Sequence, residues 1–152
     1  MMILLRGVIL LVGLLLAPTG WAATYYASPT GTGSACSIGA PCTVSQGITN
    51  VAASPGSTLL LNDGTYTGST GMIVISGKNC SSGLRCTVQA LNDGAVTIDG
   101  ESARTPIDLV DSSYWTVQGI NGKRGVTIVC TIHSTTTTYP HPSGHNEFKR
   151  LI

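Results

Sequence analysis

From residue 57 onward the chain consists of short β-prone runs, and a turn signal follows most of them. The runs lie at residues 58–61, 72–75, 86–90, 95–98, 107–110 and 114–117. Asn-Asp-Gly, Ser-Gly, Asp-Gly or Gln-Gly sequences come directly or shortly after most of these runs. No stretch with a helical period separates them, so the pattern excludes strand–helix–strand units and favours an all-β fold.

A short pattern, in which Thr is followed by Val or Ile, recurs in this region. Copies of it begin at Cys86, Val96, Trp115 and Val126. The spacings are close to multiples of about ten residues, which is typical of a chain wound into stacked coils. Short strands at intervals of about 8–12 residues also describe a β-sandwich, so a small disulfide-braced β-sandwich is the alternative.

Composition agrees with a core built mainly from aliphatic strands. Charged residues make up 10% of the chain and aromatic residues 5%, whereas 42% are hydrophobic, which excludes a disordered chain. The net charge of +1 indicates that nucleic acid is not a partner, because nucleic-acid binders are normally far more basic.

Residues 1–22 have the features of a signal peptide. Arg6 precedes an apolar run at residues 7–17, and a small-residue cleavage site ends at Ala22. The alternative is a membrane anchor, but the apolar run is shorter than the roughly 20 residues that cross a bilayer. We therefore expect a secreted or periplasmic protein that begins at Ala23 and meets the membrane only through the signal peptide during export.

The cysteines fit an oxidising compartment. Cys36 and Cys42 flank one Ser/Gly-containing segment, and Cys80 and Cys86 flank another of the same length. We predict two local disulfides, each closing a short loop. A four-cysteine zinc site is the competing interpretation, although its usual ligand spacings are shorter. Cys130 has no local partner in the sequence.

One helix is expected before the β-runs. Thr43 and Gln46 fit a capping box, and Val44, Ile48 and Val51 share one apolar face. Residues 54–56, Ser-Pro-Gly, end the helix. The predicted organisation is a signal peptide at 1–22, an N-terminal strand, disulfide loop and helix at 23–56, coils at 57–130 and an atypical tail at 131–152.

Two sequence stretches resemble a known family. Residues 25–31, Tyr-Tyr-Ala-Ser-Pro-Thr-Gly, and residues 55–66, which contain Leu-Leu-Leu-Asn-Asp-Gly-Thr-Tyr, resemble the opening of secreted right-handed parallel β-helix proteins of the pectate-lyase-like superfamily. Residues 96–100 and 113–120 are similar to the segments that form a strand and its turn in successive coils of that family. Gly56 is followed by Ser57, where many relatives have Asp.

The resemblance implies a right-handed parallel β-helix of about three coils, with residues 44–52 as a helix that covers the first coil edge. Relatives with activity cleave acidic polysaccharides, generally with catalytic groups on later coils. The sequence therefore predicts an exported relative of polysaccharide lyases and hydrolases, present as an N-terminal fragment without activity of its own. The alternative is a non-catalytic surface, carbohydrate-binding or adhesion module. Whether the chain is an enzyme stays open.

Candidate site residues come mainly from one charged stretch. Half of the charged residues of the expected mature chain lie between residues 99 and 124. Lyases need a basic residue as proton acceptor, and hydrolases need two facing carboxyl groups. The weak catalytic candidates are Asp99, Asp108, Asp111, Lys123 and Arg124, although Asp99 also fits a structural turn.

Tyr114 and Trp115 are candidates for stacking on sugar rings, or else for anchoring the core. An anionic polysaccharide is the expected partner. No cofactor is identifiable from the residues, and calcium is implied by the resemblance alone.

The last twenty-odd residues differ in composition from the coils. They contain all three histidines, the only Phe and a run of threonines. Pro142 and Gly144 disfavour a helix that would carry both His141 and His145, so we predict no metal site there. The change in composition favours a tail that is out of register with the family, through a frameshift or an early stop, over an exposed natural tail.

Overall fold

The computed structural model describes residues 21–125, 130–133 and 144–151, and of the strand at 130–133 only the backbone. The signal segment up to residue 20, the pattern copy at 126–128 and His141 therefore lie outside the described residues. The strands are β1 (Thr24–Ala27), β2 (Thr58–Leu61), β3 (Gly64–Tyr66), β4 (Ile73–Ser76), β5 (Cys86–Ala90), β6 (Val96–Asp99), β7 (Ile107–Val110), β8 (Trp115–Gln118), β9 (Ile120–Lys123), β10 (Cys130–His133) and β11 (Glu147–Lys149). The helices are α1 (Val44–Ala53) and α2 (Gly68–Gly71).

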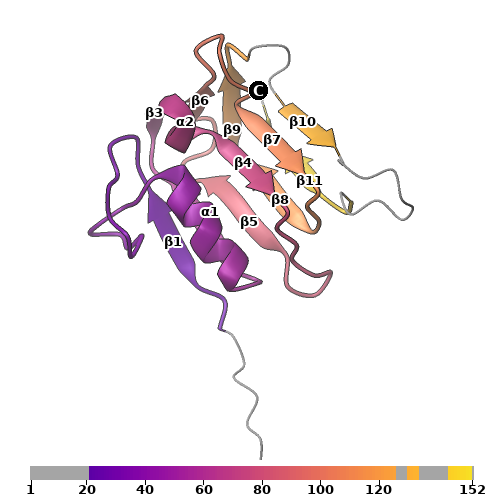
Figure 1. The fold of residues 1–152 in the computed structure, drawn as a ribbon. Helices are drawn as coiled ribbons and strands as arrows, with labels where there is room; N and C mark the ends of the chain where they lie inside the picture. The colour runs from indigo at the N-terminus through magenta and orange to yellow at the C-terminus, as the bar shows by residue number, and fades with distance from the viewer. Residues whose placement is uncertain (1–20, 126–129, 134–143, 152) are drawn as a thin grey trace, which may run out of the picture.

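The strands form three parallel sheets, which we name A, C and D. Sheet A has the order β1-β2-β5-β8-β11, sheet C the order β3-β6-β9 and sheet D the order β4-β7-β10. Each coil visits the three sheets in turn, as β2-β3-β4, then β5-β6-β7, then β8-β9-β10 (Figure 1). The predicted all-β parallel β-helix of about three coils is confirmed. The β-sandwich alternative is wrong, because sandwiches are built from antiparallel strands.

The spacing of about ten residues in the sequence corresponds to one strand with its turn, which is one of the three sides of a coil. On sheet A, Thr58 pairs with Thr87 and Thr87 with Thr116. The coil repeat along this sheet is 29 residues, as the pair Gln89 and Gln118 shows. Three strands with their turns fill that length.

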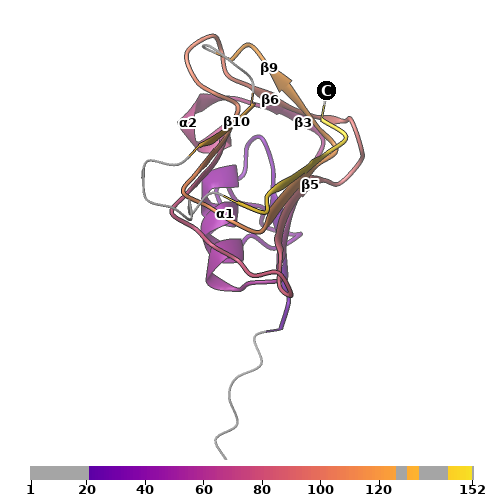
Figure 2. The same cartoon turned by 90° about the vertical axis from the view of Figure 1, so that its right-hand side faces the viewer.

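The core lies between the three sheets (Figure 2). Alternate residues of each strand point inward, as in the row Leu59, Val88 and Val117 of sheet A. Ile73 and Ile107 form a matching row in sheet D, and Val96 and Ile120 one in sheet C; all of these side chains have 0% exposure. Stacking of like residues on successive coils buries one continuous apolar column.

Helix α1 lies at the N-terminal end of the coils (Figures 1 and 2). The Thr43 hydroxyl accepts the Gln46 N–H at 3.2 Å, which confirms the predicted N-cap. Val44, Ile48 and Val51 are buried, and the helix contacts β1, β2, β4 and β5. At Gly47 the helix approaches β2 so closely that a Cβ would lie 2.4 Å from a Leu59 methyl carbon.

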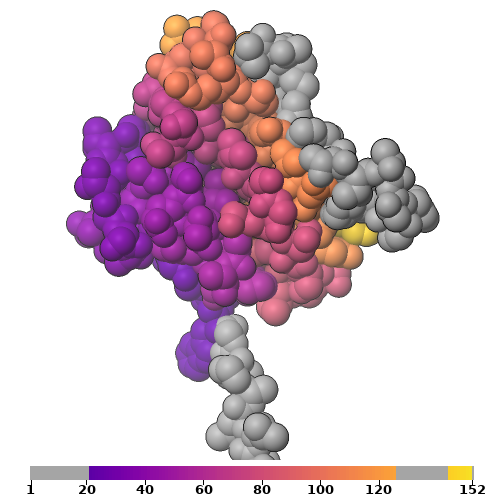
Figure 3. Space-filling model, viewed as in Figure 1, coloured from indigo at the N-terminus to yellow at the C-terminus, as the bar shows by residue number. Residues whose placement is uncertain are grey.

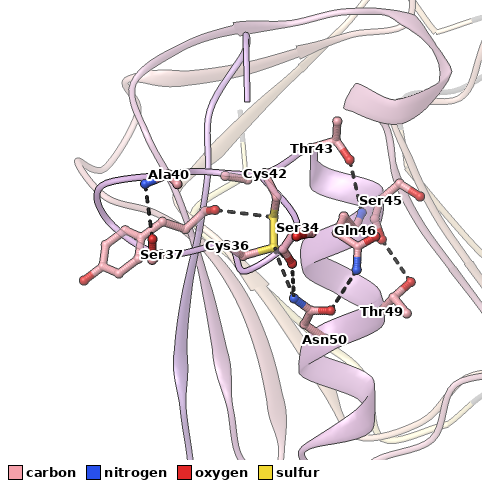
Figure 4. The surroundings of a disulfide bond; sticks show 12 residues. Ser34, Cys36, Ser37, Ala40, Cys42, Thr43, Ser45, Gln46, Thr49 and Asn50 are labelled. Carbon is pink, nitrogen blue, oxygen red and sulfur yellow. Dashed lines mark hydrogen bonds between the residues drawn. A yellow bond between two sulfur atoms is a disulfide. The ribbon is translucent and has the colours of Figure 1, made fainter. Parts of the chain in front are cut away.

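Two disulfides, Cys36–Cys42 and Cys80–Cys86, are present as predicted. The Asn50 amide on α1 donates to Cys36 Sγ at 3.2 Å, and Gln46 Nε2 donates to Asn50 Oδ1 at 2.8 Å (Figure 4). Cys86 Sγ lies 3.7 Å from the Val51 carbonyl. Both disulfides therefore brace the helix. On the face in Figure 3, α1 and the preceding loop form a continuous surface.

Residues 144–151 join the coils in spite of their unusual composition. Strand β11 pairs in parallel with β8, with Phe148 opposite Val117. The Asn146 side chain accepts the Trp115 N–H at 3.0 Å and donates to the Ser112 carbonyl at 2.9 Å. This segment therefore forms the first side of a further coil.

Four strands have bounds that sequence patterns did not predict. Strand β3 begins within the predicted Asn-Asp-Gly turn, and β9, β10 and β11 lie outside the predicted runs. Each has only three or four residues, too few for a period to be visible. Among the residues that the structure describes, neither helix is long and apolar enough to span a membrane.

Candidate functional site: a charged corner of the coils

Charged side chains gather where the chain passes from sheet C to sheet D. We name this cluster the charged corner; it consists of Asp99, Glu101, Arg104, Lys123 and Arg124. Asp99 ends β6 and Lys123 ends β9, and these two residues pair across neighbouring coils. The other three lie in the turns that follow these strands. The coil register therefore brings together residues that are far apart in sequence.

Asp99 is the buried centre of the charged corner, with only 3% of its surface exposed. Arg124 Nε donates to both Asp99 carboxylate oxygens, at 2.8 and 3.0 Å, and Arg124 Nη2 donates to Oδ2. The Glu101 N–H donates to Asp99 Oδ1 at 2.9 Å. The Arg124 hydrogen bonds, followed by the Glu101 N–H, hold the pKa of Asp99 below its usual range, so this carboxylate stays ionised.

Gly100 allows the two turns to approach each other. A Cβ at this position would lie 2.3 Å from the Arg104 carbonyl oxygen and 2.6 Å from that of Arg124. The Gly100 N–H donates to the Lys123 carbonyl at 2.8 Å, and the Ser102 N–H donates to the Arg124 carbonyl at 2.7 Å. The backbone of one coil is thus fixed on the next at this corner.

Glu101 extends the network to the first coil. Its carboxylate accepts the Gly68 N–H at 3.0 Å and Arg104 Nη1 at 2.5 Å. Glu101 adopts a φ of 56°, a left-handed conformation that is uncommon for a residue other than glycine. Both carboxylates of the corner therefore join coils to each other.

The charged corner contains three cations and two carboxylates. Lys123 is exposed, and the side chains of Arg124 and Arg104 are 54% and 39% exposed. Neither carboxylate is positioned as a free proton acceptor or nucleophile, because each already accepts a guanidinium. The arrangement can attract an anionic group at the surface, but it does not present the two facing carboxyl groups of a glycoside hydrolase.

Asp108 and Asp111 lie away from the charged corner. Asp108 is in β7, between the buried Ile107 and Leu109, and so lies on the outer side of sheet D. Asp111 follows that strand, in the turn toward sheet A. The charged residues between 99 and 124 therefore do not form one site, because the winding of the coil places them at two different corners and on the outer face of sheet D.

The aromatic candidates need a correction. Trp115 is fully buried, and its indole N–H donates to the Lys78 carbonyl at 2.8 Å, so its ring is a core anchor and is not presented to a sugar. The Tyr114 ring is stacked on His145, with centroids 4.7 Å apart and planes within 7°. One face of Tyr114 is thus already covered by its own chain.

A small hollow that sequence patterns did not indicate lies between the start of α1 and the β3–α2 connection. Ser28, Thr43, Thr67 and Thr70 are among the residues that line it. The nearby Tyr66 hydroxyl lies 2.8 Å from the Asn62 carbonyl and 3.0 Å from that of Ala27. Burial, and then the charge of Asp63, raise the pKa of Tyr66, so it stays protonated.

The fit of this chain to calcium can be judged from its carboxylates. Within the described part of the chain, no three Asp, Glu, His or Cys residues gather in a group that could hold a metal ion. Asp99 and Glu101 both accept arginine donors. These residues do not fit the oxygen-rich shell that calcium requires.

Comparison with known proteins gave one structural likeness. No family model and no curated protein matched the chain. A solved structure described as a crystal structure of pectate lyase Pel9A is similar over 66% of this chain, with 25% identity and a TM-score of 0.48. The matched part spans 28% of that structure.

Proposed function

We propose that this chain is an exported parallel β-helix protein, related to polysaccharide lyases and hydrolases, that forms the N-terminal part of such a fold and does not cleave polysaccharide by itself. The parallel β-helix fold and the sequence stretches that resemble the family support the relationship to polysaccharide lyases and hydrolases. The two disulfides support an oxidising location.

This proposal rests on the ion pairs that the charged residues of the coils form with one another. Arg124 binds Asp99 on the preceding coil. At the far end of the coils, Arg85 lies 3.7 Å from Glu147 and Arg150 lies 2.6 Å from Asp93. These pairs join different coils, and their carboxylates are engaged in structure. Catalysis of proton abstraction or glycoside hydrolysis needs groups that converge on a substrate instead.

The test is an assay of the purified, oxidised chain on polygalacturonate, alginate and a glycosaminoglycan. Unsaturated products report lyase activity by their absorbance, and new reducing ends report hydrolysis. We expect no turnover above a buffer control. Turnover that co-purifies with the chain and is abolished in a Lys123→Ala variant would contradict the proposal, since a contaminating enzyme would be unaffected by that change.

A second candidate function is that of a non-catalytic surface, adhesion or carbohydrate-binding module that takes an acidic polysaccharide. The exposed cations of the charged corner, Lys123, Arg104 and Arg124, favour it. Binding would be weak and salt-dependent, as expected for exposed charges.

Affinity electrophoresis in gels that contain polygalacturonate tests this second function. We expect retardation that Lys123→Ala reduces about two- to fivefold in affinity, since one exposed ion pair is worth up to about 1 kcal/mol. Lys78→Ala is the matched control, because Lys78 lies in the turn between sheets D and A, away from the charged corner. Equal losses in the two variants would show that net charge alone, and not this corner, sets the binding.

A further inference from the structure

Strand β11 has one paired edge and one edge without a described neighbour. It pairs with β8, and no other described strand continues sheet A beyond it. The Lys149 carbonyl accepts the Gly119 N–H at 3.0 Å, so the main-chain groups of Lys149 face β8. In a parallel strand these groups alternate sides, so the N–H and C=O of Phe148 face away from β8. These two groups could pair with another strand.

The sequence of β11 is self-complementary for antiparallel pairing. Phe148 packs toward the core, while Glu147 and Lys149 lie on the outer face, with Lys149 Nζ 2.7 Å from Glu147 Oε2. In an antiparallel pair centred on Phe148, Glu147 of each copy lies opposite Lys149 of the other. Opposite charges that face each other across strands stabilise the pair.

The other end of sheet A is closed, which limits how two copies can meet. The edge of β1 is covered by the first disulfide loop: the Tyr26 N–H donates to the Cys36 carbonyl at 2.7 Å, and the Cys42 N–H donates to the Tyr26 carbonyl at 3.0 Å. The Ser28 N–H donates to the Cys42 carbonyl at 3.1 Å. The main-chain groups of Tyr26 and the N–H of Ser28 are therefore already paired, which disfavours head-to-tail stacking of a β11 edge on β1.

We propose that two copies of this chain associate tail to tail through antiparallel pairing of their β11 strands. The contact is isologous, because the same residues meet on both copies, so it closes at a two-fold dimer and does not continue into a fibre. Each Phe148 exchanges main-chain hydrogen bonds with its counterpart, and two Glu147–Lys149 pairs flank this centre. This interface concerns the chain of 152 residues itself and involves no residue of the charged corner.

Sedimentation equilibrium of the oxidised full chain over a range of concentrations tests the proposal. We expect a monomer–dimer equilibrium in which Lys149→Glu raises the dissociation constant about tenfold or more, because two attractive pairs become two repulsive ones. Lys78→Glu makes the same change of charge away from β11 and is expected to leave the equilibrium as it is. A monomer at all concentrations, or a dimer that Lys149→Glu does not weaken, would overturn the proposal.

Mixing two variants separates pairing from folding defects. Glu147→Lys alone also loses its ion pair with Arg85, so its fold is first checked by circular dichroism. In a mixture of Lys149→Glu and Glu147→Lys, every cross-strand pair becomes attractive again. We expect heterodimers in the mixture although each variant alone is largely monomeric. Absence of heterodimers from two folded variants would contradict antiparallel pairing at β11.

Discussion

The two ends of this β-helix are stabilised by different kinds of interaction. At the N-terminal end, α1 places a buried apolar face against β1, β2, β4 and β5, and both disulfides lie against the helix. At the C-terminal end, residues 144–151 are held by the pairing of β11 with β8, by the partly buried Phe148, and by polar contacts of Asn146, Glu147 and Arg150. The N-terminal edge is therefore covered by a cross-linked apolar element, whereas the outer edge of β11 has no neighbouring strand among the described residues.

Cavity-forming substitutions give the largest expected contrast between the two ends. Ile48 is 1% exposed inside the N-terminal cover, whereas Phe148 is only partly buried against the core. We expect Ile48→Ala to lower the free energy of unfolding by about 2–5 kcal/mol. Phe148→Ala should cost about 1–2 kcal/mol, because less of its surface leaves water. Urea denaturation of both variants measures the difference, and equal losses would mean that the two ends are equally packed.

Removal of the disulfides gives the next largest effect. Replacing Cys36 and Cys42, or Cys80 and Cys86, by serine should each lower the free energy of unfolding by about 2 kcal/mol on the chain-entropy estimate for such short loops. Hydrogen exchange should show faster exchange of α1 amides in both double variants and unchanged exchange in β11. Loss of protection in β11 at the same time would show that the ends unfold as one unit.

The pH dependence of the free energy of unfolding is expected to show the smallest effect. Arg124 lowers the pKa of Asp99, and Lys149, with Arg85, lowers that of Glu147. A carboxyl group with a lowered folded pKa stabilises the fold above its unfolded pKa of about 4, and this stability is lost as the pH falls through the folded value. Stability should therefore decline with acidification, and less steeply in Asp99→Asn and Glu147→Gln. The exposed partners limit the size of both effects.

Thermal unfolding followed from pH 7 to pH 2 measures this dependence. Asp99→Asn should be less stable than the unsubstituted chain at pH 7, and the two melting temperatures should converge in acid. Parallel curves over the whole range would contradict a stabilising role for the ionised Asp99 carboxylate.

Local signals in the sequence predicted much of the fold. Thr43 and Gln46 located the start of α1, and Ser-Pro-Gly after residue 53 located its end. Five-residue spacers between cysteines predicted both disulfides, because such short Ser/Gly-containing segments can turn back on themselves. β-Prone runs with turn residues after them gave most of the longer strands, since both features act over only a few residues.

The candidate site was less predictable than the fold. Asp99 and Arg124 were both identified as candidates, but their mutual hydrogen bonds follow from the register of β6 and β9 and not from the sequence. Trp115 follows Tyr114 directly, and only the pleat of β8 decided that its ring is buried in the core. The hollow lined by Ser28 and Thr70 joins segments that no local motif connects.

The sequence by itself determined the local elements of this protein: the β-runs, their turns, the capped helix and the paired cysteines. Tertiary structure decided which residues meet, because coil register depends on the summed length of three strands and three turns. That register joined Asp99 to Arg124 and separated Asp108 and Asp111 from them. It also placed residues 144–151 on sheet A, where pairing with β8 and burial of Phe148 outweigh an unusual local composition.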